Sequence, residues 1–517
     1  MNHRAGKNAI IENTTDLSRE NDRMKRKFFF VLFSCFLFST CAFSTFEFNE
    51  RMQQAYLQII RLKFDEGKRL LEKEQLLNPA NQLPLLYDNY IDFLKAFISE
   101  EKKDLDDCVR NTDKRLKMLR DENSPFSLYS RAEIMLQDAI LKVKFHEFVS
   151  AAWEIRKIYK ITEQNTDRFP TFPLNRKISG LLKVVIGAIP KDYSWLTDLV
   201  GMEGTIIQGT LELTHLLKQT EGTNFRVYKD EILFYLSSIQ SSFSKNDDTA
   251  IESTELMRPL CRESLLMRYS YSNVLMKAGR NDEALQLLAD SALPKNSYPV
   301  YFLSYKFGLA KLRKLDFSAE KDFQNFIIHF HGRNNLRSAY QKLAWIYLLQ
   351  GDQKKYTTGI SWCKKYGYDF IDEDKDATVE SVRGEIPNVI LLRSRLLFDG
   401  GYYKQALSEI AGKSIDHFPR FKDQLEVTYR FARILQKLNE FDKAVQYYEE
   451  TLKNGASSGY YFAANSALLL GIMYEEKNNF GKAKNYYTKC LSMRKHEYQN
   501  SIDQKAKAGL ERVRAKK

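Results

Sequence analysis

The stretch Ala467-Leu-Leu-Leu470-Gly471-Ile-Met-Tyr474, followed nine residues later by Ala483-Lys-Asn-Tyr-Tyr487-Thr-Lys-Cys490, decides the fold expected for this 517-residue chain. Each half has the apolar spacing of an amphipathic helix, and the residues between them suit a turn. Gly471 and Ala483 lie twelve positions apart, where two antiparallel helices would need small side chains in order to approach closely. The bulky residues on either side would fill the space around that contact. The stretch therefore predicts a helix-turn-helix unit.

The same spacing recurs upstream, twice clearly and several times in diverged form. The clear copies are Ala432-x-x-Leu435 with Phe441-x-x-Ala444-x-x-x-Tyr448, and Ser394-x-x-Leu397 with Tyr403-x-x-Ala406-x-x-x-Ile410. Weaker copies pair residues 272–275 with 284–288, 308 with 319–323, 344–347 with 351–362, 55 with 67, and 139 with 148–155.

Nothing along the chain shows the sustained alternation typical of strands, and most of the 11 prolines fall where helices are expected to end. We therefore expect an all-α fold, a solenoid of antiparallel helix pairs with a more diverged helical N-terminal half. An ordinary helical bundle is the alternative for residues 46–240. The expected organisation is residues 1–44 as an N-terminal extension and signal, 45–245 as a diverged helical domain, 250–375 as weaker repeats and 376–517 as clear repeats.

Over at least residues 260–495 the pattern resembles the tetratricopeptide repeat (TPR) superfamily. The anchors Ala406, Ala444 and Ala483 are spaced 38 and 39 residues apart, against a typical period of about 34, and the surplus falls in loops such as 454–459. The resemblance implies a stacking and binding device without catalytic residues. Residues 372–403 resemble exported TPR proteins of Bacteroidota that carry no assigned activity, which implies a location in the cell envelope, at the periplasm or the outer-membrane periphery.

The N-terminus has the pattern of a secretory signal. Lys25-Arg26-Lys27 precedes an apolar and small-residue run over 28–43, and Ala42-Phe43-Ser44 predicts cleavage before Thr45. Met24 is the expected true start. Two alternatives stay open: a membrane anchor retained at 28–43, although this run is short for a spanning helix, and lipidation of Cys41.

Cysteine and charge exclude some functions. Cys108, Cys261, Cys363 and Cys490 show no C-x-x-C spacing, so we expect buried thiols and no zinc or redox motif. The net charge is +13, but the basic residues are spread out and form no blocks, so nucleic acid is not an expected partner.

No sequence motif indicates catalysis, and neither cofactor nor metal is expected. His329-x-His331 is interpreted as a solvated helix terminus. Asp372-Glu-Asp374-Lys-Asp376 has the start of a calcium loop, but Ala377 stands where such a loop needs glycine. The acids are therefore predicted to cap a helix over 377–382 and to compensate its dipole.

Residues 177–217 combine apolar runs with five glycines at 180, 187, 201, 204 and 209. Glycine inside a helix costs about 1 kcal/mol relative to alanine, so close helix packing is expected to offset that cost. This predicts a tightly packed central helix pair, with an apolar groove or membrane-facing patch as the alternative.

The leading hypothesis for function is a non-enzymatic exported scaffold that binds a protein or peptide along its concave face. That face is expected to be lined by the first helix of each pair, with candidate contacts at Arg393, Arg430, Arg433 and Asn465. The alternative is an envelope assembly or transport accessory that contacts lipid or glycan through 177–217.

Overall fold

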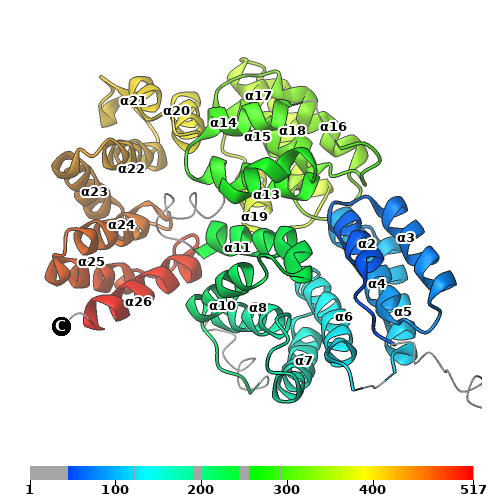
Figure 1. Ribbon diagram of the computed structural model, residues 1–517. Coiled ribbons are helices and arrows are strands. Elements are labelled where there is room, and N and C mark those ends of the chain that lie inside the picture. Colours follow the sequence, from blue (N-terminus) through cyan, green and yellow to red (C-terminus); the bar gives the residue numbers. More distant parts are fainter. Residues whose placement is uncertain (1–44, 121–122, 190–200, 244–254, 291–293, 516–517) are drawn as a thin grey trace, which may run out of the picture.

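The computed structural model describes residues 45–120, 123–189, 201–243, 255–290 and 294–515, and within these ranges the chain is helical and contains no strand. The predictions for residues 1–44, for the signal and for the boundary near 245–250 concern residues outside the described ranges. Figure 1 shows successive helices running as hairpins that follow one another around the molecule, and this confirms the expected all-α solenoid.

The N-terminal region consists of the helices α2 (Glu50–Ile60), α3 (Phe64–Leu77), α4 (Leu83–Ser99), α5 (Lys102–Met118), α6 (Pro125–Lys144), α7 (Phe148–Arg168), α8 (Asn175–Ala188), α10 (Ile206–Gln219) and α11 (Lys229–Phe243). The middle repeats are α13 (Leu265–Lys277), α14 (Asn281–Ala289), α15 (Phe302–Arg313), α16 (Ala319–His329), α17 (Leu336–Leu349), α18 (Gln353–Lys365) and the single helix α19 (Asp372–Arg383).

The C-terminal repeats are α20 (Val389–Asp399), α21 (Tyr403–Ile410), α22 (Phe421–Lys437), α23 (Phe441–Gly455), α24 (Phe462–Glu476), α25 (Phe480–Ser492) and α26 (Gln499–Ala515). Short 3₁₀ segments lie at η2 (Asn224–Tyr228), η3 (Glu255–Arg262) and η4 (Ile415–His417).

The contact predicted between Gly471 and the next helix is confirmed. A Cβ added at Gly471 would lie 2.5 Å from Tyr487 Cε1, so only glycine lets α24 and α25 approach this closely. Ala483, Tyr487 and Cys490 are fully buried on the facing side of α25. Asn479 caps α25, because its side chain accepts a hydrogen bond from the backbone N–H of Lys482.

The diverged N-terminal half uses the same device. A Cβ at Gly67 would lie 2.5 Å from Ile59 Cγ1, which is the close approach expected where Ala55 and Gly67 are twelve apart. Helices α2 and α3, α4 and α5, and α6 and α7 pack as successive neighbours. The predicted pairs at 55–67 and 139–155 are therefore present.

The glycine-rich segment forms the predicted helix pair. Helix α8 packs along α10, and a Cβ at Gly209 would lie 2.3 Å from the carbonyl oxygen of Gly180. A Cβ added at Gly187 would lie 2.5 Å from the backbone nitrogen of Ile206, and one added at Gly204 would lie 2.7 Å from the Cα of Lys183. Close backbone contact explains why glycine is used inside these helices; residues 190–200 lie outside the described part of the chain.

The four cysteines outside the N-terminal run are buried and free. Burial raises the pKa of each thiol to about 12. The expectation of buried thiols is confirmed.

The acids at 372–376 begin helix α19 but do not cap it in the predicted way. Ile371 occupies the N-cap position, and no side chain caps this end. The carboxylate of Asp374 instead accepts hydrogen bonds from the backbone N–H groups of Asn335, at 2.6 Å, and Ser338, at 2.8 Å, and so caps the neighbouring helix α17. The capping prediction for α19 is therefore wrong, because tertiary packing turns Asp374 toward another helix.

Two contacts join parts of the solenoid that are far apart in the sequence. Gly401, before α21, meets Gly279, after α13, so closely that a Cβ would lie 2.0 Å from the Gly279 carbonyl oxygen. At the other side Glu100, at the end of α4, accepts hydrogen bonds from the backbone N–H groups of Arg333 and Asn334 at 2.9 and 2.8 Å. The C-terminal repeats consequently lie beside the middle repeats (Figure 1), and a cavity forms inside the curve.

Candidate functional site

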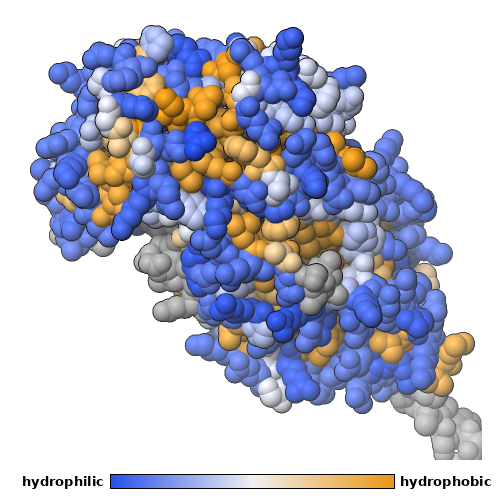
Figure 2. Space-filling model, turned by 90° about the horizontal axis from the view of Figure 1, so that it is seen from above, coloured by the Kyte–Doolittle hydropathy of each residue, from blue (hydrophilic) through white to orange (hydrophobic). Residues whose placement is uncertain are grey.

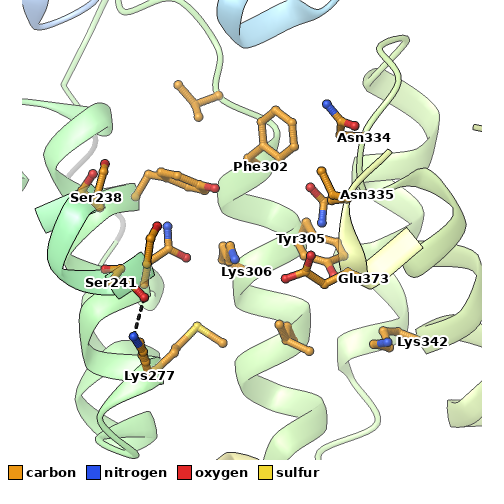
Figure 3. Close-up of a pocket in the computed structure, with 18 of the residues that line it drawn as sticks. Ser238, Ser241, Lys277, Phe302, Tyr305, Lys306, Asn334, Asn335, Lys342 and Glu373 are labelled. Atoms are coloured by element: carbon orange, nitrogen blue, oxygen red, sulfur yellow. Dashed lines mark hydrogen bonds between the residues drawn. The ribbon is translucent and has the colours of Figure 1, made fainter. Parts of the chain in front are cut away.

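A cavity of about 680 Å³ lies on the inner side of the curve. Its walls come from the first helices of successive pairs, α13, α15, α17 and α20, together with α11 and α19, whereas α14, α16 and α18 contribute none of the lining residues. This agrees with the expectation that first helices line the inner face. Figure 3 shows Ser238 and Ser241 of α11 on one side, Lys306 of α15 in the middle, and Glu373 and Lys342 on the other side.

Aromatic rings and small polar groups make up much of the cavity wall. Figure 2 shows a largely hydrophilic face with apolar side chains exposed on the upper lobe and in the middle of the view. The rings that line the cavity are Phe97, Phe234, Tyr269, Phe302, Tyr305 and Trp345, and the amides are Asn273, Asn334 and Asn335. A volume of this size with mixed apolar and polar walls is typical of a ligand-binding site.

Lysine side chains reach into the cavity over aromatic rings. Lys306 Nζ lies 5.7 Å from the ring centres of both Tyr269 and Tyr305. Lys342 Nζ lies 4.1 Å from the ring centre of Trp345 and donates a hydrogen bond to Gln341 Oε1 at 2.5 Å. The ring faces stabilise these ammonium groups by cation–π attraction.

The pKa of Lys342, one of the basic groups that line the cavity, is lowered. Burial lowers its pKa to about 8, and the positive charge of Arg395 acts in the same direction. Asp376, Glu380 and Glu373 of α19 oppose the shift only in part. A lysine with this pKa is mostly charged at pH 7 and mostly neutral at pH 9.

One rim of the cavity is held by the Glu100 contact. Lys144 Nζ lies 2.8 Å from Glu100 Oε1, and Asn334 Nδ2 donates to the same oxygen at 3.0 Å. Burial alone would raise the pKa of Glu100, but Lys144 and the Asn334 hydrogen bonds outweigh it and hold the pKa below its usual value. Glu100 is therefore ionised at neutral pH and joins the N-terminal region to the middle repeats.

A smaller pocket of about 280 Å³ adjoins the cavity. It lies among α17, α19, α20, α22 and α24 and shares Trp345, Asp376 and Arg395 with the cavity. Glu426 and Arg430 pair within it at 2.8 Å, and Arg383 pairs with Glu497.

The four predicted contact residues do not form one site. Arg430 lines the smaller pocket, but it is buried and holds Glu426. Arg393 lines neither the cavity nor the smaller pocket. It forms a bidentate ion pair with Glu409, at 2.8 and 2.9 Å. Arg433 and Asn465 both donate to the Tyr429 hydroxyl, and Asn465 also lines a separate surface pocket beside α26. Their role in partner binding stays a prediction.

Sequence reasoning did not select the residues that line the cavity. Lys342 is the one lysine of α17 and Lys306 is one of two in α15, and no local pattern separates either from a solvated lysine. One signal was present: both lie on the first helices of pairs, at 302–313 and 336–349, where the inner face was expected. Helices α11 and α4 contribute to the wall because distant parts of the solenoid come together there. No repeat pattern in the sequence encodes that arrangement.

The described ranges contain neither a metal-binding cluster nor a membrane-spanning helix. In the ranges that the structure describes, no group of three or more His, Cys, Asp and Glu side chains is arranged to hold a metal ion. None of the helices described is both long enough and apolar enough to cross a bilayer.

Residues 423–496 match the family model described as tetratricopeptide repeat. The matched segment covers helices α22 to α25, so this part of the chain consists of tetratricopeptide repeats. No curated protein matches the chain.

Three solved structures with similarity to the chain are the following. The human IFIT1 dimer with PPP-AAAA is 14% identical, with a TM-score of 0.32, over 88% of this chain and 96% of that chain. The Cut9–Hcn1 hetero-tetramer of APC/C is 11% identical, with a TM-score of 0.29, over 90% and 96%. The P58(IPK) TPR domain is 13% identical, with a TM-score of 0.22, over 83% and 97%.

Proposed function

We propose that this protein is a non-enzymatic scaffold that holds a segment of a partner protein. The segment would bind in the 680 Å³ cavity on the inner side of the curve, called the central cavity below. The observation that carries the proposal is the lining of that cavity. First helices of four successive pairs contribute polar and aromatic side chains to the wall of this cavity. Tetratricopeptide repeats over 423–496 support the same conclusion, because such repeats build extended concave binding surfaces.

Photo-crosslinking tests this proposal directly. A benzoylphenylalanine in place of Asn273 puts the reactive ketone in the cavity, and the same group in place of Lys354, on the outer helix α18, is the matched control. We expect crosslinked partner peptides at position 273 and not at 354. The variant Ser238→Trp, which fills the cavity from α11, should remove them. Equal crosslinking at both positions would contradict the proposal.

We further propose that the scaffold works in the cell envelope after export. The basic residues at 25–27, the apolar run over 28–43 and the small residues before Thr45 support this. A mature N-terminus at Thr45, found by mass spectrometry of the protein from its native cells, would agree with cleavage. An N-terminus at Met24 in a membrane fraction would indicate the retained anchor instead.

A second candidate function is contact with lipid or glycan through 177–217. The observation in its favour is on α10, where Ile207 and Leu211 are 74% and 64% exposed, one helical turn apart. Flotation with anionic liposomes tests it: binding that is lost in Ile207→Ser/Leu211→Ser would support a membrane-surface role. If the protein stays in the soluble fraction, this candidate fails.

A further inference from the structure

The central cavity and the pocket beside it differ in the sign of their charge. Six basic and four acidic side chains line the cavity, whereas four basic and six acidic side chains line the adjoining pocket. Arg395 and Asp376 belong to both and mark the place where the two meet. A single elongated ligand that occupies both spaces would therefore meet a positive part followed by a negative part.

Three of the basic side chains that line the cavity form no close ion pair with the protein's own carboxylates. Among the ion pairs of the described residues, Lys306, Arg313 and Lys342 have no carboxylate within 4 Å; their closest polar contacts are neutral groups and ring faces. By contrast, Lys144 in the same wall is paired with Glu100. Cations withdrawn from water without a counter-charge are costly, and a ligand carboxylate would remove that cost.

The negative excess in the adjoining pocket centres on Glu380. Its carboxylate accepts hydrogen bonds from Gln341 Nε2 at 2.7 Å, Trp345 Nε1 at 2.9 Å and Tyr356 OH at 3.0 Å. All three donors are neutral, and no described cation pairs with it. The other acids there have partners, as Glu426 has Arg430 and Glu497 has Arg383.

Apolar surface accompanies the charges. The half-buried Phe302 and Leu309 line the cavity between the basic side chains, and the buried side chains of Leu391, Leu392 and Phe462 form the apolar wall of the adjoining pocket. A segment with apolar side chains at intervals between its charges would match both kinds of wall. A compact inorganic anion would leave these surfaces uncovered.

We propose that the cavity and the adjoining pocket together bind one extended bipolar segment of a partner protein, with its acidic part beside Lys306 and Lys342 and its basic part beside Glu380. This inference rests on the scaffold function proposed above and adds the chemistry of the partner. Opposite charges at the two ends fix the direction in which the segment lies, because the reversed orientation would place like charges together.

Binding of defined peptides to the full-length protein tests the proposal. Three fluorescein-labelled 12-residue peptides share leucine at alternate positions and differ at the other six, which are all Glu, all Lys, or three Glu followed by three Lys. We expect the bipolar peptide to bind at least about tenfold more tightly than the all-Lys peptide, and more tightly than the all-Glu peptide. The preference should weaken as salt is added.

Single variants assign the two ends. Lys306→Gln and Lys342→Gln should each weaken the bipolar and all-Glu peptides several-fold, and Glu380→Gln should weaken the bipolar peptide without affecting the all-Glu peptide. Lys354→Gln, on the outer face of α18, is the control and should change nothing. Circular dichroism and thermal unfolding identify any variant that fails to fold, and the remaining variants still decide the question.

A pH titration adds a readout that a purely structural role would not give. The charged groups that face Lys342 are Arg395 of α20 and Glu373, Asp376 and Glu380 of α19. Since a bound carboxylate favours the ammonium form, affinity for the all-Glu peptide should fall as pH rises through about 8 in the native protein. The fall should be absent in Lys342→Gln.

Equal affinity for the all-Glu and all-Lys peptides, or affinity unchanged in both lysine variants, would overturn the inference. That failure is distinguishable from failure of the scaffold function, because crosslinking at position 273 reports an occupant of any charge. Crosslinks without a charge preference would leave the scaffold standing and remove the bipolar segment.

Discussion

The N-terminal region (α2–α11) and the C-terminal repeats (α20–α26) are built from the same helix hairpins but have different interiors. In the C-terminal repeats, tyrosines such as Tyr448 and Tyr487 are buried among alanines and glycines, and their hydroxyls reach polar groups at the edge. Tyr487 OH, for example, donates to Glu475 at 2.5 Å. The hydroxyls of Tyr448 and Tyr487 each bond to the preceding helix of the same hairpin, at Gln436 and Glu475.

The N-terminal region instead encloses a charged network. Lys177 of α8 is fully buried, with Nζ 2.9 Å from Glu133 Oε1 of α6 and 2.6 Å from Glu231 Oε2 of α11. Its ammonium also donates to Tyr90 OH of α4, and Tyr56 OH of α2 donates to Glu231, both at 2.6 Å. One cluster thus connects five helices that are far apart in sequence. The comparison shows two ways to stabilise helix hairpins. One is close packing between adjacent helices, and the other is a buried ionic network that several hairpins share.

Protonation of this network follows from its composition of two carboxylates and one ammonium. Burial raises the pKa of Glu133, Lys177 opposes that rise, and the nearby Glu231 adds to it. Burial would lower the pKa of Lys177, but the two glutamates more than offset it and the pKa lies above the usual value. The lysine therefore stays charged, and its loss would leave two buried acids without a counter-charge.

The largest effect is expected from Lys177→Met. Removing one partner of a buried ionic group costs about 3–5 kcal/mol, so urea denaturation followed by circular dichroism should show that loss. Lys157→Met, at an exposed position of α7, should leave stability unchanged. A loss below about 1 kcal/mol would break the comparison, because the network would then contribute no more than a surface ion pair.

A smaller and more local loss is expected from Gly471→Val. The added side chain would collide with the ring of Tyr487, and overpacking of this kind costs about 1–3 kcal/mol. Hydrogen exchange should accelerate in α24–α26 and remain unchanged in α2–α8. The control is Gly481→Ala in α25, where an added Cβ meets nothing closer than 3.9 Å. Faster exchange throughout the N-terminal region would show that the two regions unfold together.

Glu100→Gln tests the connection between the N-terminal region and the middle repeats. Hydrogen bonds to a charged group contribute about 1.5–3 kcal/mol, so a loss of about 1–2 kcal/mol is expected at pH 7. Because the pKa of Glu100 is lowered in the folded protein, its contribution is present above the unfolded pKa and is lost as pH falls. The difference from the native protein should therefore shrink below about pH 4. A difference in stability that does not change with pH would show that the negative charge of Glu100 does not contribute to this connection.

The smallest effect concerns thiol reactivity. In a Cys35→Ser/Cys41→Ser background, the four buried thiols should react slowly with a disulfide reagent at pH 8, because burial holds their pKa at about 12. Cys490, in the C-terminal repeats, should react about tenfold faster than Cys108, since local contacts open more readily than a region held by a shared network. Equal rates would indicate that both regions open in the same event.

Much of the fold could be predicted from short spacings. The pair Gly471 and Ala483 placed α24 beside α25, and Ala55 and Gly67 did the same for α2 and α3. The glycines at 180 and 209 predicted the close helix pair α8–α10. The site could not be predicted in this way. Asp374 was expected to cap its own helix and instead caps α17. Arg430 lines the smaller pocket and pairs there with Glu426, and its role in partner binding stays a prediction.

The sequence by itself determined the hairpins, because helix periodicity, turn residues and the small residues at close contacts act within some forty positions of one another. Tertiary structure alone decided which distant helices meet. The partners of Lys177 lie 44 and 54 residues away, and Glu100 reaches Asn334 across 234 residues. Such contacts depend on how each intervening hairpin is oriented relative to the next. Local spacing in the sequence does not specify these orientations.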